Sequence, residues 1–228
     1  MESKTKKNLR RAAIGSATLV TLFLGFGGLL HTKAGRPWLA KLAKCPVQAS
    51  PEAVASARKS AVASLRGTQA IATRPALGFS LDTTSRDDVK AWAERNRVSC
   101  TELRGGASIR CDEVPAAVLP EAAGQPDVIR EVMFGFRESG HLQQIETLSS
   151  RMSPDAAADA YRGSVASLAS VIGGPTSGTT DTDPNTLAAT SYALSTCQFQ
   201  YSNYVATITV MNVASSGILL RQQFLSAT

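Results

Sequence analysis

Apolar residues recur at two different spacings after residue 78, and each spacing predicts a different kind of element. Helical spacing, near 3.6 residues, occurs over residues 84–96 and again over residues 153–172. The first segment begins with hydroxyl residues that can cap a helix. The second begins with Ser153 and Pro154, a helix-start pair, and stops at Gly173. We therefore predict a helix in each segment.

Alternating spacing, typical of strands with one buried face, fills most of the remaining chain. A first hairpin is predicted around residues 99–111 and a second over residues 131–149, in the order strand, turn, strand. Three more strands are predicted over 190–200, 204–213 and 217–225. The order helix, four strands, helix, three strands predicts an α+β domain. Its antiparallel sheet has about seven strands and helices packed on one face. Because both halves read helix then strands, a degenerate tandem duplication is an additional hypothesis.

This order of elements resembles the small exported α+β modules of the BamE/SmpA and β-lactamase-inhibitor-protein group. The resemblance covers residues 79–225 and is architectural. It implies an exported protein built on a helix-covered antiparallel sheet. One lipoprotein feature is missing, because Cys45 lies well beyond the apolar run and Lys44 stands where a lipobox needs a small residue. No functional residue is therefore carried over to this chain.

The N-terminus has the pattern of a membrane anchor. Five basic residues lie within residues 1–11, and residues 12–30 follow without a charge for 19 positions. A spanning helix needs about 20 apolar residues, and a basic flank stays in the cytoplasm. We predict a single-pass inner-membrane protein with residues 1–11 cytoplasmic and 12–30 as a transmembrane anchor or uncleaved signal. In the alternative, cleavage near Ala34 releases a secreted chain.

The formal charge of +6 is unevenly distributed along the chain. Residues 35–74 carry a net charge of +6, whereas residues 75–228 carry −5. We predict that residues 31–75 form a basic juxtamembrane helical stalk, with an Ala-rich helix over 50–66, beside anionic headgroups. Residues 76–228 are predicted to be the extracytoplasmic domain. Its acidic balance argues against nucleic acid as a partner.

Two of the four cysteines, Cys100 and Cys111, lie at equal distance from the pair Gly105-Gly106. Whether the loop holds two residues or four, the two cysteines face each other across the hairpin. We predict a structural disulfide, which implies an oxidising compartment. Two unpaired core thiols are the next alternative. A metal or redox pair is the least favoured, because the spacing is longer than CxxC. Cys45 and Cys197 remain as a second candidate pair, with Cys45 alternatively a free thiol, a lipidation site or a dimer crosslink.

The sequence contains no recognisable catalytic, cofactor or metal motif. One of its two histidines, His141, follows a turn glycine and is predicted to be exposed. The loop that begins at Asp181 has oxygen side chains at calcium-loop positions 1, 3 and 5, but Thr186 and Tyr192 depart from that pattern. We therefore predict a non-catalytic binding or assembly module, without a cofactor, for a protein partner in the cell envelope. The alternative is an envelope enzyme, hydrolase-like, with a site that its sequence does not reveal.

Overall fold

The computed structural model describes residues 51–119 and 126–228. The chain divides into two compact units, Met1–Ser60 and Ala61–Thr228. The described part of the first unit is the beginning of helix α3 (Pro51–Leu65). Every helix within the described ranges is too short or too polar to cross a membrane. The predicted cytoplasmic flank, the predicted anchor and Cys45 lie outside the described residues. The topology of the N-terminus and the pairing of Cys45 therefore remain predictions.

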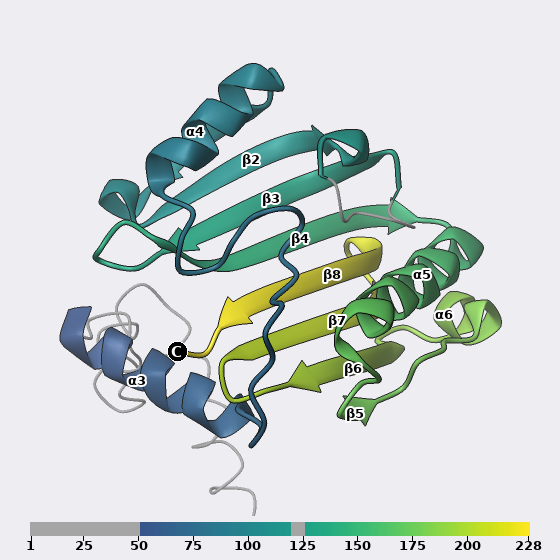
Figure 1. The fold of residues 1–228 in the computed structure, drawn as a ribbon. Coiled ribbons are helices and arrows are strands. Elements are labelled where there is room, and N and C mark those ends of the chain that lie inside the picture. The colour runs from purple at the N-terminus through teal and green to yellow at the C-terminus, as the bar shows by residue number, and fades with distance from the viewer. Residues whose placement is uncertain (1–50, 120–125) are drawn as a thin grey trace, which may run out of the picture. The chain divides into compact units, whose positions relative to one another are not determined.

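The second unit is built on one antiparallel sheet of eight strands in the order β1-β2-β3-β4-β8-β7-β6-β5 (Figure 1). The predicted α+β class is confirmed, with eight strands in place of about seven. The additional strand, β5, is a two-residue edge strand in a segment with no alternating apolar pattern, so its backbone pairing left no signal in the sequence. The strands are β1 (Ser99–Leu103), β2 (Ser108–Pro115), β3 (Val128–Phe136), β4 (Leu142–Met152), β5 (Ser177–Gly178), β6 (Leu194–Gln200), β7 (Tyr204–Val213) and β8 (Gly217–Ser226).

The two predicted helices are present, and local sequence signals set their first residues. Helix α4 (Arg86–Arg95) begins with a reciprocal capping box between Ser85 and Asp88. Helix α5 (Pro154–Ile172) begins with the Ser153 cap and a proline in its first turn. A short helix that was not predicted, α6 (Pro184–Ala189), starts where Asp183 accepts two backbone N–H groups. Two 3₁₀ turns, Arg104–Gly106 and Ala116–Val118, complete the described elements.

The main core lies between the sheet and helices α4 and α5 (Figure 1). One register row crosses six strands with every side chain buried, and the buried faces of both helices pack against the same cluster. The row consists of Ile109, Phe134, Ile145, Phe224, Ala206 and Phe199. Near α4, Phe79, Trp92 and Phe134 form an edge-to-face aromatic cluster with ring centroids 5.0–5.7 Å apart.

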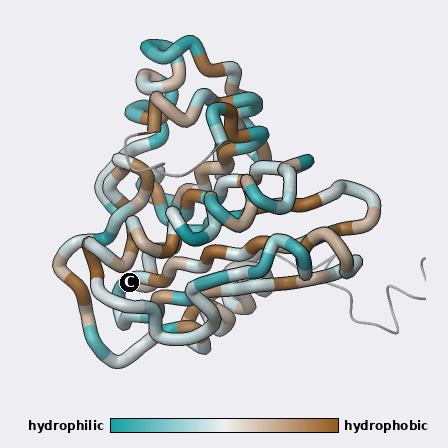
Figure 2. The backbone as a smooth tube through the Cα atoms, turned by 90° about the vertical axis from the view of Figure 1, so that its right-hand side faces the viewer, coloured by the Kyte–Doolittle hydropathy of each residue, from teal (hydrophilic) through white to brown (hydrophobic). Residues whose placement is uncertain are grey.

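The last turns of α3 pack on the opposite face of the sheet. Val62 and Leu65 contact Val205 and Leu225, which form a second, separate core cluster with Ala227. Val205 and Leu225 are one position out of phase with the main core row, and successive strand residues point to opposite faces. Residue hydropathy accordingly changes between hydrophobic and more polar from one residue to the next along the strands (Figure 2).

The segment that follows α3 also contacts the sheet. The backbone of Ile71 exchanges two hydrogen bonds with the Asn203 side chain, at 3.0 and 2.8 Å. Tyr204 donates its hydroxyl proton to the carbonyl oxygen of Pro75 at 2.6 Å. A side chain on Gly67 would meet the carbonyl oxygen of Gln200 at 2.1 Å, so the two backbones approach closely there. Residues 61–75, assigned to the stalk by their charge, thus pack on the folded unit; the boundary at residue 76 remains a prediction.

Candidate interaction surface

The predicted disulfide is present. Cys100 and Cys111 are cross-strand partners in β1 and β2, bonded through their sulfurs with Cα atoms 4.0 Å apart. Leu103 pairs with Ser108, so the hairpin uses the four-residue loop of the two alternatives. Because Cys111 is fully buried and β1 is an edge strand, the bond fastens this edge to the core. A buried, cross-strand position of this kind is that of a structural disulfide.

Cys197, a member of the second candidate pair, is fully buried in β6 and takes no part in a disulfide among the described residues. Burial raises the pKa of its thiol, which keeps the thiol protonated and weakly nucleophilic. Cys45 lies outside the described residues, so their pairing stays a prediction.

His141 is exposed, as predicted, at the turn between β3 and β4. Its Nδ1 lies 3.2 Å from the hydroxyl of Ser139, and it makes no other side-chain contact of this kind within the described ranges. A serine or carboxylate mechanism needs the imidazole in contact with a nucleophile and an orienting carboxylate. The described residues around His141 do not form that arrangement.

A partly buried ionic network surrounds Asp82, whose side chain is 24% exposed. Its carboxylate accepts hydrogen bonds from Arg74 at 2.5 Å, from Arg137 at 2.8 and 3.1 Å, and from Ser226 at 2.6 Å. Burial alone would raise the pKa of Asp82, but the hydrogen bonds from Ser226, Arg74 and Arg137 outweigh it and lower the pKa. With these donors on one carboxylate, the network joins three segments that are distant in the sequence, and we assign it a structural role.

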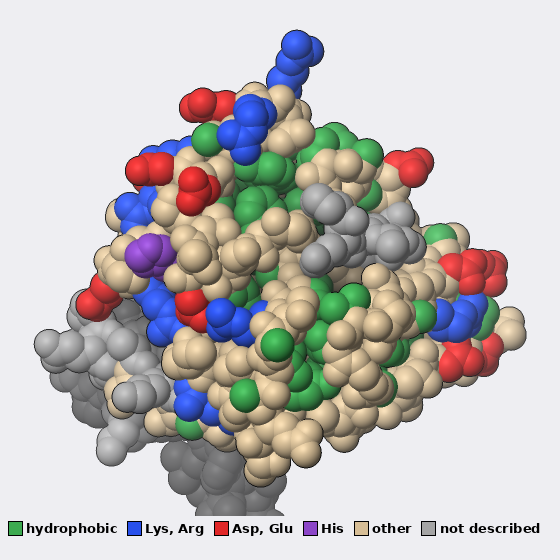
Figure 3. Space-filling view, viewed as in Figure 1, with side chains coloured by type: hydrophobic (Ala, Val, Ile, Leu, Met, Phe, Trp, Pro, Cys, Tyr) green, Lys and Arg blue, Asp and Glu red, His purple; other side chains and the backbone are tan. Residues whose placement is uncertain are grey.

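Sequence reasoning missed this network, because Ser226 lies 144 residues from Asp82 and no motif links them. The loop that begins at Asp181, which departs from the calcium-loop pattern, uses its carboxylates in contacts within the protein. Asp181 binds Arg162 at 3.0 Å, and Asp183 caps α6. No cluster of three or more metal-ligating side chains occurs in the part of the chain that the structure describes. On the helix-bearing face, charges of both signs lie interspersed (Figure 3).

The sheet face opposite α5 has two apolar ends and a polar middle. One end is covered by Val62 and Leu65. The middle holds a bidentate ion pair between Arg221 and Glu146, with N–O distances of 2.7 and 2.9 Å. The other end is a register row of Leu194, Met211 and Leu219, one residue from each of β6, β7 and β8. We call these three residues the apolar row.

The apolar row is open to solvent. Leu194 is 64% exposed, and the neighbouring Tyr192 is 74% exposed. Met211 and Leu219 are partly exposed. Tyr192 has a φ of +68°, a left-handed conformation that is strained for an aromatic residue and often marks functional positions. Adjacent exposed apolar side chains on a regular sheet are typical of a protein-binding surface.

Comparison with known proteins identifies no family for this chain. No protein-family model matches the chain, and searches of curated proteins and of solved structures returned no match. Fold and surface thus define the class: an α+β protein with one eight-stranded antiparallel sheet, a hairpin disulfide and an uncovered apolar row.

Proposed function

We propose that this protein is a membrane-held, extracytoplasmic binding module whose apolar row contacts a protein of the cell envelope. The exposure of Leu194 beside Tyr192, in line with Met211 and Leu219, is the observation that carries the proposal. Transfer of Leu194 into an interface favours association by roughly 1.5–3 kcal/mol, since most of its side chain is in water. The polar strands beside the row supply the hydrogen-bonding rim that interfaces use.

The compartment in this proposal is supported by the disulfide, since such bonds persist outside the reducing cytoplasm. The apolar run 12–30 behind a basic flank supplies the anchor. An anchored module meets other membrane proteins at a high effective concentration, so an interface of a few apolar side chains is sufficient. An envelope protein with an exposed apolar segment is therefore the partner that we propose.

The two halves of the domain support the hypothesis of a tandem duplication. In each half a helix is followed by a four-strand meander: α4 precedes β1–β4, and α5 precedes β5–β8. The two meanders join through their last strands, β4 and β8. The likeness to exported BamE/SmpA-like and β-lactamase-inhibitor-protein-like modules remains part of this proposal. The first strands of the two meanders, β1 and β5, lie at the sheet edges.

The test is site-specific photo-crosslinking in intact cells. A photoreactive residue at Leu194 should give one dominant adduct with an envelope protein, whereas the same residue at Thr207, in the polar middle of this face, should give none. The adduct should disappear when Leu219→Asp is added, while the circular dichroism of that variant stays unchanged. Equal adducts at both positions, or a product of twice the mass of this chain, would overturn the proposed partner. Protease protection of the domain in spheroplasts would overturn its location.

A further inference from the structure

The sheet face opposite α5 is long enough to seat a helix along β7 and β8. On β7 the path runs from Val205 at the covered end to Met211 in the apolar row, and on β8 from Leu225 to Leu219. Six strand residues at about 3.3 Å each span about 20 Å, which is the length of about 13 residues of α-helix. Both ends of this path are apolar, and its middle is polar.

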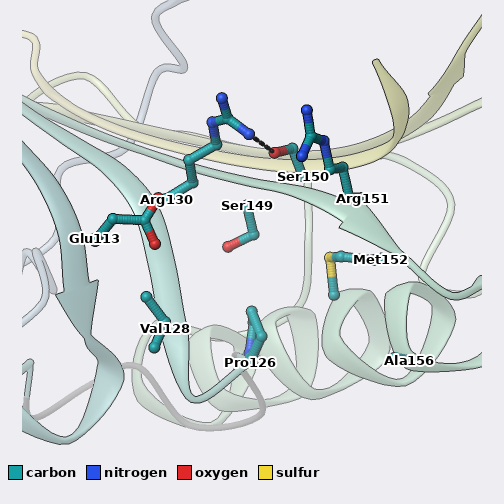
Figure 4. A pocket seen from close by; sticks show the side chains of 9 residues that line it. All are labelled: Glu113, Pro126, Val128, Arg130, Ser149, Ser150, Arg151, Met152 and Ala156. Atoms are coloured by element: carbon teal, nitrogen blue, oxygen red, sulfur yellow. Dashed lines mark hydrogen bonds between the residues drawn. The ribbon is translucent and has the colours of Figure 1, made fainter. Parts of the chain in front are cut away.

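Polar residues border this path on the side of β4. Leu219 pairs with Ser150, whose hydroxyl accepts a hydrogen bond from Arg130 at 3.3 Å. Figure 4 shows Arg151 close to that contact, so the opening between β3 and β4 has a charged border. A segment with apolar side chains that binds this face therefore follows β7 and β8 and does not cross to β4.

The covered end of the path holds a helix of the chain itself, the last turns of α3. Val62 and Leu65, three residues apart and hence on one side of that helix, contact Val205 and Leu225. Val205 is 3% exposed and Leu225 is 6% exposed, so an apolar pair of this spacing fits the sheet surface closely. The occupant in the structure thus shows what this face accepts, which is a helix with apolar residues at i and i+3.

Few interactions hold this part of α3 on the sheet. Among the described side chains of α3, none forms a hydrogen bond or an ion pair with the sheet, and Ser64 donates to the carbonyl oxygen of Ala61 within the helix. Leu65 is itself only partly buried. The contact is therefore limited to two apolar side chains, which a second helix with the same pattern can replace.

The chain that follows α3 is held separately from it. The backbone of Gly67 lies against Gln200, and the carbonyl oxygen of Gln69 accepts a hydrogen bond from the backbone N–H of Ser202 at 2.8 Å. Arg66, between α3 and this anchored stretch, is exposed. The last turn of α3 can therefore leave the sheet by a change of backbone angles near Arg66, while the rest of the fold stays in place.

We propose that the last turn of α3 is an autoinhibitory cover, which limits the partner to the apolar row until it moves aside and the whole face accepts an amphipathic α-helix of that partner. One apolar pair of the helix replaces Val62 and Leu65, and a second pair, three to four turns away, contacts the apolar row. Polar side chains between the two pairs face Thr207 and Thr209. This inference rests on the proposed function, because it names the segment that the envelope partner supplies.

The first experiment uses the full chain in detergent and a stapled synthetic helix as the probe. The probe has about 18 residues, with a leucine pair at i and i+3 near each end on one side and polar residues elsewhere. A control peptide of the same composition carries its two leucine pairs on opposite sides. Fluorescence anisotropy should show saturable binding of the probe and none of the control. Absence of probe binding, or equal binding of both peptides, would overturn the helix site.

Hydrogen exchange measures the displacement of α3 directly. Saturating probe should speed exchange of the amides of residues 62–66, because a short helical turn frays once its packing is lost. The control peptide should leave this exchange unchanged. Probe binding without faster exchange at residues 62–66 would show that the helix binds elsewhere.

Variants of α3 separate the cover from the site beneath it. The double variant Val62→Ser, Leu65→Ser, which we call the opened variant, should bind the probe about tenfold more tightly, because the site is free in a larger fraction of molecules. The double variant Ala61→Ser, Ala63→Ser, on exposed positions of the same turn, is the matched control and should leave the dissociation constant unchanged. Met211→Asp should weaken binding to the opened variant. Equal affinity of the opened variant and the wild type would exclude α3 as a competitor.

Photo-crosslinking in intact cells distinguishes this inference from the proposed function. With the photoreactive residue at Thr207, the wild-type chain should give no adduct, whereas the opened variant should give the adduct that forms at Leu194. An adduct at Leu194 with none at Thr207 of the opened variant overturns the cover and leaves the proposed partner in place. No adduct at either position, with probe binding retained, overturns the proposed partner and leaves the helix site in place.

Discussion

Removal of the Cys100–Cys111 disulfide is the perturbation whose size the structure defines best. The bond closes a loop with a sequence separation of 11 residues. The chain-entropy relation then gives a stabilisation of about 3 kcal/mol, through the restriction of the unfolded chain. For a chain of this size, the double variant Cys100→Ala, Cys111→Ala should melt about 6–12 °C lower than the wild type.

The measurement needs a control for the loss of a buried sulfur, since Cys111 is fully buried. Cys197→Ala removes a buried sulfur outside the Cys100–Cys111 bond, and as long as Cys197 is not bonded to Cys45 it should cost about 1 kcal/mol. Scanning calorimetry or thermal circular dichroism should therefore show a clearly larger loss for the double variant than for this control.

Reducing agent gives an independent check of the same quantity. It should lower the melting temperature of the wild type nearly to that of the double variant, and it should leave the double variant unchanged. A drop in the double variant no larger than that of Cys197→Ala would refute the entropic reasoning. A further effect of reductant on the double variant would reveal another disulfide, such as the predicted pair of Cys45 and Cys197.

Three other changes test separate parts of the fold. Asp82→Asn should cost about 2 kcal/mol at pH 7 by urea titration. Because the folded-state pKa of Asp82 is lowered, the difference from wild type should begin to shrink as pH falls below about 4 and should vanish only below the folded-state pKa. A pH-independent difference would exclude the ionic network. The fragment 76–228 lacks the packing of Val62 and Leu65 on the sheet and should be about 2–4 kcal/mol less stable than the fragment 61–228. Equal stability would place the domain boundary at residue 76, as the charge pattern predicts. Gly178→Ala, with a φ of +91° and its new Cβ 2.0 Å from a backbone oxygen, should lose about 1–3 kcal/mol, whereas Gly174→Ala, in open space, should change stability little.

The helix starts and the hairpin disulfide could be predicted from the sequence because they depend on local interactions. The Ser85 capping box, the Ser153 cap with its following proline, and the facing of Cys100 and Cys111 all depend on groups within a dozen residues of each other. Short-range geometry fixes such features with little contribution from the rest of the chain. For the same reason the α+β class and seven of the eight strands were predictable from spacing alone.

The pairing of distant segments was decided only by the tertiary structure. Any alternating strand can pair with any other, so nothing in the sequence indicates that β4 meets β8, or that Leu194, Met211 and Leu219 fall in one row. The contacts of Asp82 likewise join residues far apart in the sequence that only folding brings together. A single-residue change of register would turn the three side chains of the apolar row to the opposite face of the sheet. Composition and spacing therefore determined the elements, whereas three-dimensional packing determined which side chains share a surface.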